Sequence, residues 1–439
     1  MSLIILDGTS NDPSVSEHLI ELAESRGVTV IHFALASLRI APCLGDFECW
    51  IRTPGICRTR DEGQEIARAM HDASLVVFLT PILFGGYSAD LKKAVDRLIG
   101  LVQPHFTERN GTTRHVPRYA RYAPVLFIGI SGQSNDESAE IFREMAAGNA
   151  ANLLAPAYYT HHVSPGSAHW KSELGEALNK ALDGLPGLPS IAPTAEALQM
   201  ACVADRLDPA DQQAPRSIAI LIGSARPKGS STSESLARQL MEDLEKSNVR
   251  TSLVFASQFI KSGQQAEDGL NTMLAADLLI VVAPIYVDGL PSLVTRALEK
   301  LALRLRAEKH PLRKVAGLLN CGYPEAEHNR IAMRLLCNFS HESGLTWAGG
   351  LALGGGEIIH GRPLSSLRFM VRGPIRALQL AASALAEGQP IPVAASRLMA
   401  RPLVPTLLFR WVARIRWILQ ARAHGIDSRQ LLARPHDPH

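Results

Sequence analysis

Short apolar runs alternate with amphipathic segments along the first part of the chain. The runs at 2–8, 74–81 and 123–131 contain few polar residues, as expected for parallel strands that are buried on both faces. The segments between them, such as 14–27 and 88–100, place apolar residues at helical spacing. This alternation predicts an α/β fold with a doubly wound parallel sheet of about five strands.

The same order of strands and helices starts again at residue 216. A gene duplication is the economical explanation, because a chance repeat of one strand–helix unit would not reproduce the whole series. The stretch 166–215 is rich in proline and polar residues and reads as a helix followed by an interdomain linker. We therefore expect α/β domains at 1–165 and 216–362, and a helical C-terminal extension over 363–439.

Composition fits a pair of ordinary globular domains. Apolar residues make up 46% of the 439 residues, and the net charge of +3 gives no reason to expect a nucleic acid partner. The most apolar C-terminal stretch is interrupted by Arg410, Arg414 and Arg416, so we expect no integral membrane span. The start has no basic n-region, and six cysteines without a signal segment indicate a reducing compartment. A cytoplasmic protein is the resulting expectation.

The loop from Gly223 to Ser235 follows the first strand of the second half. Ligands of open parallel sheets bind beyond the carboxyl ends of the strands, where strand order reverses. This loop offers many hydroxyl groups, the positive charges of Arg226 and Lys228, and the free N–H groups of the helix behind it. These features favour a phosphate site. A serine-rich loop that only caps a helix would look the same, so both interpretations stay open at this point.

Two further loops should reach the same edge of the sheet. Pro284 fixes the exit of the third strand, Tyr286 offers an aromatic face to a planar ring, and Gly289 lets the backbone approach a ligand and donate its N–H. The fourth-strand loop adds Gly322 and Tyr323. Tyr286 would also serve simply to cover the edge of the core, so the convergence of three loops carries more weight than any one of them.

These loops resemble those of the NADPH-dependent FMN reductase family of flavodoxin-like flavoproteins, in both halves of the chain. In that family the first loop reads roughly G-S-x-R with Ser and Asn following, and it holds the FMN phosphate. The loop after the third strand reads P-x-Y-x-G-x-x-S-A-x-L-K-x-x-x-D-R and holds the isoalloxazine. The first half matches this second pattern in register at Pro81, Gly85, Ser88, Ala89, Leu91, Lys92, Asp96 and Arg97.

The resemblance implies two flavodoxin-like domains in tandem, with FMN as cofactor and NAD(P)H as co-substrate. It implies hydride transfer from nicotinamide to FMN and on to a small acceptor such as a quinone or free flavin, with no catalytic side chain required. Family members dimerise, so we expect a homodimer or an internal pseudo-dimer. The residues expected to bind the cofactor are Ser224, Arg226, Ser230, Ser231, Ser233, Pro284, Ile285, Tyr286, Gly289, Gly322, Tyr323, Pro81, Phe84 and Gly85.

The two halves depart from the family pattern in different ways. The first keeps the ring loop, with an exposed Phe84 expected beside the usual aromatic position, but its phosphate loop has Asp7 and Asp12 and no Arg or Lys. The second keeps the phosphate loop but has lost the S-A-x-L-K run. One full site in the second domain is the leading interpretation, and two occupied sites come next. A non-catalytic electron carrier or scaffold is the alternative function.

Three cysteines, Cys43, Cys49 and Cys57, lie near the start of the chain. Some relatives, the iron–sulfur flavoproteins, bind a [4Fe–4S] cluster with four closely spaced cysteines. Here Asp46 stands at the second position of that pattern, and four thiolates are the normal requirement. We therefore favour a structural loop with reduced thiols over a cluster.

The segment "RWVARIRWILQARAHG" near the C-terminus is amphipathic and basic. It places Trp411, Ile415, Ile418 and Leu419 on one side, and this face suits either an acidic membrane surface or the chain's own domain. Docking on the chain's own domain is the favoured interpretation. Family members that end in a similar motif support it, and the matching residues here are Trp417, Gln420, Ala421, Gly425, Ala433, Arg434 and Pro435.

Overall fold

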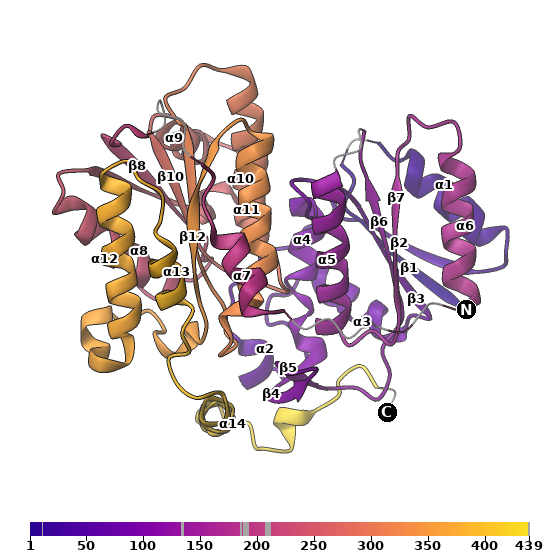
Figure 1. Ribbon diagram of the computed structural model, residues 1–439. Helices are drawn as coiled ribbons and strands as arrows, with labels where there is room; N and C mark the ends of the chain where they lie inside the picture. The colour runs from indigo at the N-terminus through magenta and orange to yellow at the C-terminus, as the bar shows by residue number, and fades with distance from the viewer. Residues whose placement is uncertain (11, 133–135, 185–186, 188–192, 207–211, 438–439) are drawn as a thin grey trace. The chain divides into compact units, whose positions relative to one another are not determined.

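The computed structural model describes residues 1–10, 12–132, 136–184, 187, 193–206 and 212–437. The chain forms two compact units, each of which contains one twisted sheet covered by helices (Figure 1). Unit 1 consists of Met1–Ile191 and Arg410–His439, and unit 2 of Ala192–Phe409.

Unit 1 is built on a five-stranded parallel sheet in the order β2-β1-β3-β6-β7. One layer of its core fills the space between the sheet and helices α1 and α6, with side chains such as Leu3, Val77 and Leu174 fully buried. The strands are β1 (Ser2–Asp7), β2 (Thr29–Ala34), β3 (Leu75–Pro81), β6 (Val125–Ile130) and β7 (Tyr158–Val163), and the helices are α1 (Ser14–Glu24), α2 (Glu48–Ile51), α3 (Gly63–Asp72), α4 (Ala89–Val95), α5 (Asp136–Asn152) and α6 (Trp170–Asp183).

Unit 2 contains the same sheet, with the order β12-β11-β10-β8-β9. Starting from β9, this order is β9-β8-β10-β11-β12, and its strands correspond one by one to β2-β1-β3-β6-β7 of unit 1. Both sheets are parallel throughout, which confirms the predicted tandem flavodoxin-like fold. The strands are β8 (Ser217–Ile222), β9 (Arg250–Phe255), β10 (Leu278–Pro284), β11 (Lys314–Asn320) and β12 (Thr346–Leu353), and the helices are α7 (Ala195–Cys202), α8 (Thr232–Glu245), α9 (Gln264–Leu274), α10 (Ser292–Ala307), α11 (Arg330–Glu342), α12 (Arg372–Ala386) and α13 (Val393–Met399).

The duplication extends to single hydrogen bonds at the carboxyl edge of each sheet. The amide of Gly8 donates to the carbonyl of Leu79 at 2.8 Å, and in unit 2 the amide of Gly223 donates to Val282 at the same distance. Pro81 lies opposite Ile130 on the neighbouring strand, as Pro284 lies opposite Asn320. These matches give a residue-by-residue correspondence between the two sites.

An antiparallel hairpin in unit 1 has no counterpart among the predicted elements. It consists of β4 (Val102–Arg109) and β5 (Thr112–Pro117), joined by Asn110 and Gly111 with φ angles of 51° and 74°. An Asn-Gly pair is the strongest short-range signal for a two-residue hairpin, because both residues tolerate positive φ. The sequence therefore contained the signal, and the polar character of the strands concealed it.

The C-terminal extension does not form a separate body. Helices α12 and α13 pack on the sheet of unit 2 through residues such as Leu378 and Ala395. Beyond Phe409 the chain belongs to unit 1, where α14 (Thr406–Ala423) contributes Trp417 and Ala421 to a core cluster with Trp50. The predicted docking of the C-terminal motif is thus confirmed at these two residues.

Of the four residues on the predicted apolar side, Ile418 packs against this cluster, whereas the prediction is wrong for the other three. Trp411 and Leu419 are 64% and 57% exposed, and Val412 and Ile415 on the same side of α14 are exposed as well. The helix packs through the opposite side instead. Within the described part of the chain, no helix combines the length and the apolarity needed to cross a bilayer.

Candidate functional site

Asn320 joins the loops that the sequence analysis expects to converge in unit 2. Its Nδ2 donates to the Oγ of Ser233 at 2.9 Å and to the carbonyl of Ala283 at 3.1 Å, and its side chain is buried. One amide thus ties the loop after β8 to the ends of β10 and β11. Strand β10 lies between β8 and β11, so the three loops share one edge of the sheet.

The loop after β8 has the features expected of an anion-binding turn. Ser231 caps α8 by accepting a hydrogen bond from the amide of Glu234 at 3.1 Å. Thr232 and Ser233 follow in the first helical turn, whose N–H groups have no acceptor within the helix and lie at its positive end. A Cβ on Gly223 would lie 2.5 Å from Val294, so only glycine lets the loop leave the sheet this closely.

Arg226 of this loop is held by a residue that the sequence analysis missed. Its Nη2 lies 3.1 Å from Oε1 of Glu357, and its Nη1 lies 3.2 Å from Nδ1 of His360. The segment that carries both partners rests on the loop, since Thr232 Oγ1 donates to the carbonyl of Gly356 at 2.7 Å. Only the glycine run that follows β12 hints at this contact in the sequence. A carboxylate therefore already neutralises the arginine expected to meet a phosphate.

The loop contains a second carboxylate, Glu234, whose side chain is almost fully buried. It accepts the amide of Gly229 at 2.5 Å and pairs with Arg238. Ser230 donates its Oγ to the carbonyl of Pro227, so this hydroxyl serves the turn itself. The remaining hydroxyl groups of the predicted set belong to Ser224, Ser231 and Ser233.

The loop after β10 is a two-residue turn that two backbone hydrogen bonds close. Tyr286 N donates to Gly289 O at 2.9 Å, and Gly289 N donates to Tyr286 O at 3.1 Å. The turn thus uses the N–H of Gly289 that the sequence led us to expect as a donor to a ligand. Val287 and Asp288 take positive φ angles of 47° and 60°, which is strained backbone for a β-branched residue. The turn presents Pro284, Ile285 and Tyr286 partly exposed.

The loop after β11 completes the edge. Gly322 is exposed, and a Cβ built on it meets no heavy atom within 4 Å. The ring of Tyr323 lies 4.2 Å from that of the buried His328, at an interplanar angle of 31°. Burial raises the pKa of the neighbouring Cys321 thiol far above its usual value, so the thiol stays protonated. Gly322 is open to solvent, and Tyr323 is partly exposed, at the same edge of the sheet as the turn after β10.

Unit 1 has the same turn, but its surroundings differ. Leu83 and Gly86 exchange backbone hydrogen bonds of 3.0 and 2.7 Å, with Phe84 and Gly85 at φ angles of 56° and 90°. The expectation that Phe84 is exposed is wrong, since the residue is 8% exposed. A Cβ on Gly85 would lie 2.6 Å from Cβ of Ile141 on α5. The glycine is thus required by helix packing rather than by approach to a ligand.

The phosphate loop of unit 1 carries negative charge. Asp7 accepts the amide of Thr9 at 2.8 Å and lies 3.0 Å from Nε2 of His32. Burial raises the pKa of this carboxyl, but the hydrogen bonds from His32 and Thr9 outweigh it and hold the pKa below its usual value. Ile130 stands where unit 2 has Asn320, so the amide that joins the loops is replaced by an apolar side chain. Asn11, at the position of Arg226, is outside the described residues.

In unit 1, the polar residues of the motif that resembles the family's ring loop make hydrogen bonds and ion pairs that stabilise the fold. Ser88 caps α4 and donates to the carbonyl of Gly8 at 2.8 Å. Lys92 and Asp96 form an ion pair that is almost wholly buried. Arg97 makes two hydrogen bonds of 2.8 Å to Asp61. These three interactions account for the Ser, Lys, Asp and Arg of the motif without a ligand.

Arg97 also fixes the segment that contains the N-terminal cysteines, through the carbonyls of Ala41 and Thr59. Burial raises the pKa of Cys43 to about 12 and that of Cys49 well above the usual value. Asp46, which stands at a cysteine position of the cluster pattern, accepts the amide of Glu48 at 3.1 Å. Protonated thiols and an engaged carboxylate suit a structural role for this segment.

Comparison with known proteins adds evidence about descent. The model of one family, described as NADPH-dependent FMN reductase, matches residues 1–160 and again residues 216–355. Two curated iron–sulfur flavoproteins, from Methanocaldococcus jannaschii and Archaeoglobus fulgidus, are 35% and 31% identical to the chain over 83 residues. Those residues are 19% of this chain, and the match spans only 42% of the length of each relative. The double family match confirms the predicted tandem duplication.

Solved structures with similar folds are more distant. An NAD(P)H:quinone oxidoreductase from Methanothermobacter marburgensis is 14% identical with a TM-score of 0.33, over 41% of this chain and 97% of that one. An FMN-dependent NADH-azoreductase from Bacillus anthracis, solved in complex with FMN, is 16% identical with a TM-score of 0.31, over 41% and 98%.

Proposed function

Because the chain belongs to the NADPH-dependent FMN reductase family, we propose that it is an FMN-dependent NAD(P)H oxidoreductase whose flavin site lies in unit 2. The observation that carries this placement is Asn320, which ties Ser233 of the anion-binding turn to the end of β10. Unit 1 has Ile130 at the same position and Asp7 in its phosphate loop. The negative charge of Asp7 would repel a dianionic phosphate bound in the corresponding loop of unit 1.

The residues of unit 2 fit the cofactor part by part. Ser224, Ser231 and Ser233 offer hydroxyl groups, and the first turn of α8 offers N–H groups with a positive dipole end. Arg226 adds a guanidinium group, whose two parallel N–H donors suit phosphate. These groups would hold the phosphate of FMN.

The ring would lie against the two neighbouring loops. Pro284, Ile285 and Tyr286 would cover one side, with Gly322 and Tyr323 on the other. When bound, FMN supplies the redox chemistry, taking hydride from NAD(P)H and passing electrons to a small acceptor such as a quinone or free flavin. The protein's part is to bind and orient the flavin, so we assign no acid or base to a side chain.

Titration of the full chain with FMN tests this proposal directly. We expect one equivalent to bind with micromolar or tighter affinity, because only unit 2 has the complete set of groups. Quenching of flavin fluorescence measures the stoichiometry. Two equivalents would contradict the assignment to unit 2, and no binding at 100 micromolar FMN would contradict the proposed function.

A carrier without reductase activity remains the second candidate. A scaffold that has lost its cofactor belongs to the same alternative, and the pair between Arg226 and Glu357 favours that form of it, because the phosphate must compete with a carboxylate. Oxidation of NADPH in the presence of a quinone separates the two candidates. A protein that binds FMN and leaves NADPH unchanged is a carrier.

The substitution Glu357→Gln should tighten FMN binding about fivefold. Removal of one negative charge near the phosphate should improve the binding free energy by about 1 kcal/mol. Glutamine keeps an oxygen acceptor for Arg226 but removes the charge that repels phosphate. The matched control is Glu308→Gln, which removes the carboxylate from the pair with Arg304 at the far end of α10. Weaker binding by the Glu357 variant would show that this carboxylate positions Arg226 instead of competing with phosphate.

A further inference from the structure

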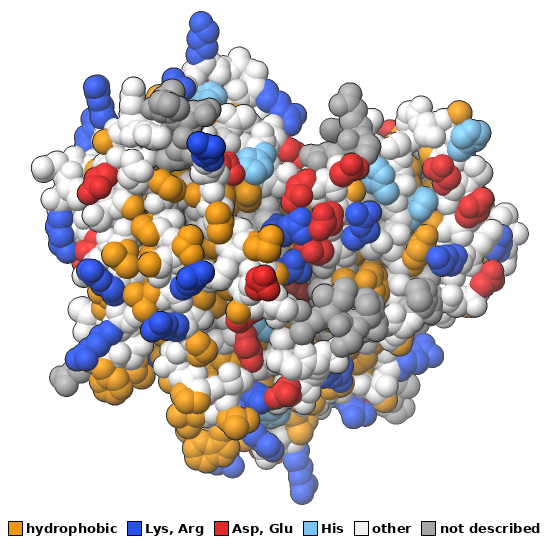
Figure 2. Space-filling model, in the orientation of Figure 1, with side chains coloured by type: hydrophobic (Ala, Val, Ile, Leu, Met, Phe, Trp, Pro, Cys, Tyr) orange, Lys and Arg blue, Asp and Glu red, His pale blue; other side chains and the backbone are white. Residues whose placement is uncertain are grey.

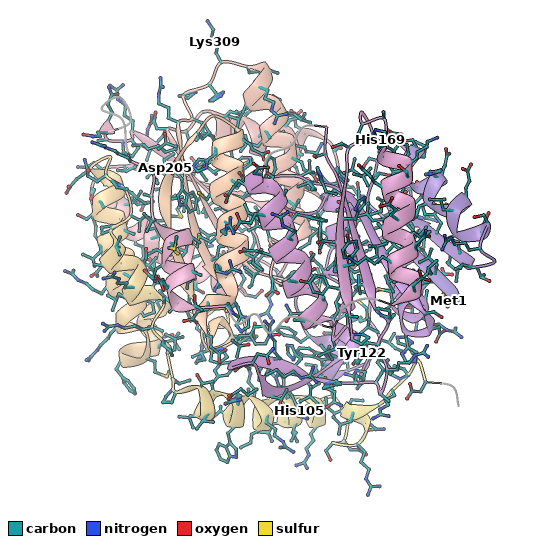
Figure 3. All side chains as sticks on the ribbon, turned by 45° about the vertical axis from the view of Figure 1, so that its right-hand side comes forward. Met1, His105, Tyr122, His169, Asp205 and Lys309 are labelled. Carbon is teal, nitrogen blue, oxygen red and sulfur yellow. The ribbon has the colours of Figure 1, made fainter. Side chains whose placement is uncertain are left out.

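Three metal-ligating side chains meet on the surface of unit 2, away from the loops described above. Cys337 and His341 are four residues apart on α11, so both lie on one side of the helix. Asp205, from the segment after α7, reaches the same spot, and Figure 3 labels it beside α11. The ligand atoms of the three residues all lie within 4.8 Å of one another.

The distances lie within a few tenths of an ångström of the spacing that zinc requires. Nε2 of His341 lies 3.0 and 3.1 Å from the two carboxylate oxygens of Asp205, and 3.9 Å from Sγ of Cys337. With Zn–N near 2.0 Å and Zn–S near 2.3 Å, ligands at tetrahedral angles lie about 3.3 to 3.6 Å apart. Small rotations of these side chains would therefore bring all three to one ion.

The carboxylate is also held in position, as metal ligands usually are. Oδ2 of Asp205 accepts the amide of Trp347 at 2.8 Å, and the amide of Asp205 donates to the carbonyl of Trp347 at 2.9 Å. Both backbone contacts fix the segment against β12. We propose that Asp205, Cys337 and His341 bind a zinc ion, with its fourth position open to water or an external ligand.

Cobalt(II) titration of the chelator-treated full chain tests this site. We expect one equivalent to produce a thiolate-to-cobalt charge-transfer band that zinc abolishes by displacement. Cys337→Ser should remove the band, and Asp205→Asn or His341→Ala should weaken cobalt binding at least tenfold. Cys57→Ser, in the N-terminal segment with three cysteines, should leave the band unchanged. A band that survives Cys337→Ser, or the absence of any band with 100 micromolar cobalt, would overturn the proposal.

A second, independent inference concerns the outward side of α14, the face formed by Trp411, Val412, Ile415 and Leu419. All four are exposed, and they recur at the spacing of one helix side. Figure 2 shows apolar side chains that project from α14 at the lower edge of the view. Isolated exposed apolar residues are normal, whereas a contiguous face that includes tryptophan marks an interaction surface.

The charges around this face select the partner. The helix contains Arg410, Arg414, Arg416 and Arg422 and no acidic residue. Of these, Arg414 and Arg422 are exposed, and Arg410 pairs with Glu108 of its own unit. A helix that combines an apolar face with arginines as its only charged side chains is typical of helices that lie in the headgroup region of anionic membranes. We infer that α14 docks unit 1 on the surface of an anionic lipid bilayer.

Flotation of the full chain with lipid vesicles provides the test. We expect binding to vesicles of phosphatidylcholine with 30% phosphatidylglycerol, and at least tenfold weaker binding to pure phosphatidylcholine. The double variant Trp411→Ser/Leu419→Ser should lower binding to the anionic vesicles at least tenfold, as should Arg414→Glu. Leu303→Ser, which changes an equally exposed leucine on α10, is the matched control and should bind normally.

Three results would overturn the lipid inference. The first is that the chain binds neither type of vesicle, and the second is that it binds both types equally. The third is that the wild type does not bind lipid but forms a dimer, which the substitution Leu419→Glu dissociates. In the last case a second copy of the chain covers the face. Circular dichroism of each variant confirms that a loss of binding does not reflect unfolding.

Discussion

Arg226→Ala should weaken FMN binding about 100-fold, which corresponds to about 2.7 kcal/mol and lies within the range for charge-assisted hydrogen bonds. The substitution removes the only guanidinium that the anion-binding turn contributes. It also leaves Glu357, now 3.1 Å from the arginine, beside the phosphate without a compensating cation. Fluorescence titration of the full chain with FMN measures the change.

Two companion variants sharpen this experiment. Arg226→Lys keeps the charge but loses the parallel donors, so its affinity should fall between those of the wild type and the alanine variant. Arg250→Ala removes an exposed arginine at the amino end of β9 and should bind FMN normally. An affinity loss below threefold in Arg226→Ala would place the phosphate elsewhere in the molecule.

Asp96→Ala should lower the free energy of unfolding of unit 1 by about 3 to 5 kcal/mol, the usual cost of removing one member of a buried ion pair. The side chain of Lys92 is only 2% exposed and would lose the carboxylate that balances it. The double variant Lys92→Met/Asp96→Leu should recover most of the loss, because apolar side chains of similar volume need no charge partner. Urea unfolding followed by circular dichroism reports the change.

The same variants separate stability from cofactor binding. If the flavin lies in unit 2, Asp96→Ala should leave the FMN affinity unchanged at temperatures where unit 1 is folded. Glu21→Ala, which removes an exposed carboxylate near His18 in unit 1, should change the unfolding free energy by less than about 1 kcal/mol. A stable Asp96→Ala protein that binds FMN poorly would assign the family motif of unit 1 to the cofactor after all.

The sheets and their duplication were predictable because burial on both faces leaves a clear mark on a parallel strand. Runs such as those of β3 and β10 contain almost no polar residue, and their repeated order fixed the topology. The hairpin β4–β5 escaped because its strands are largely polar and only Asn110 and Gly111 mark its turn. A local signal was present there, but hydrophobic periodicity alone did not reveal it.

The site was harder to predict because its details depend on contacts between distant residues. The pairing of Arg226 with Glu357 joins residues 131 positions apart. The glycine at position 85 is required by Ile141 of α5, and the amide of Gly289 is used in a turn that Val287 and Asp288 give little reason to expect. Resemblance to a family motif correctly located the loops, but it did not separate residues that support the fold from residues that would meet a ligand.

The C-terminal motif of unit 1 has a consequence for synthesis of the chain. Arg118 is fully buried, and its guanidinium donates to the carbonyls of Leu431 and Ala433. Those acceptors follow the whole of unit 2 in the sequence, so they are translated after it. The N-terminal part of unit 1 can therefore complete these contacts only after its own duplicate has been translated. A chain cut short before residue 431 would keep the hydrogen bonds from Arg118 to Gly100 and Val102 but would leave its buried Nη1 without these two acceptors.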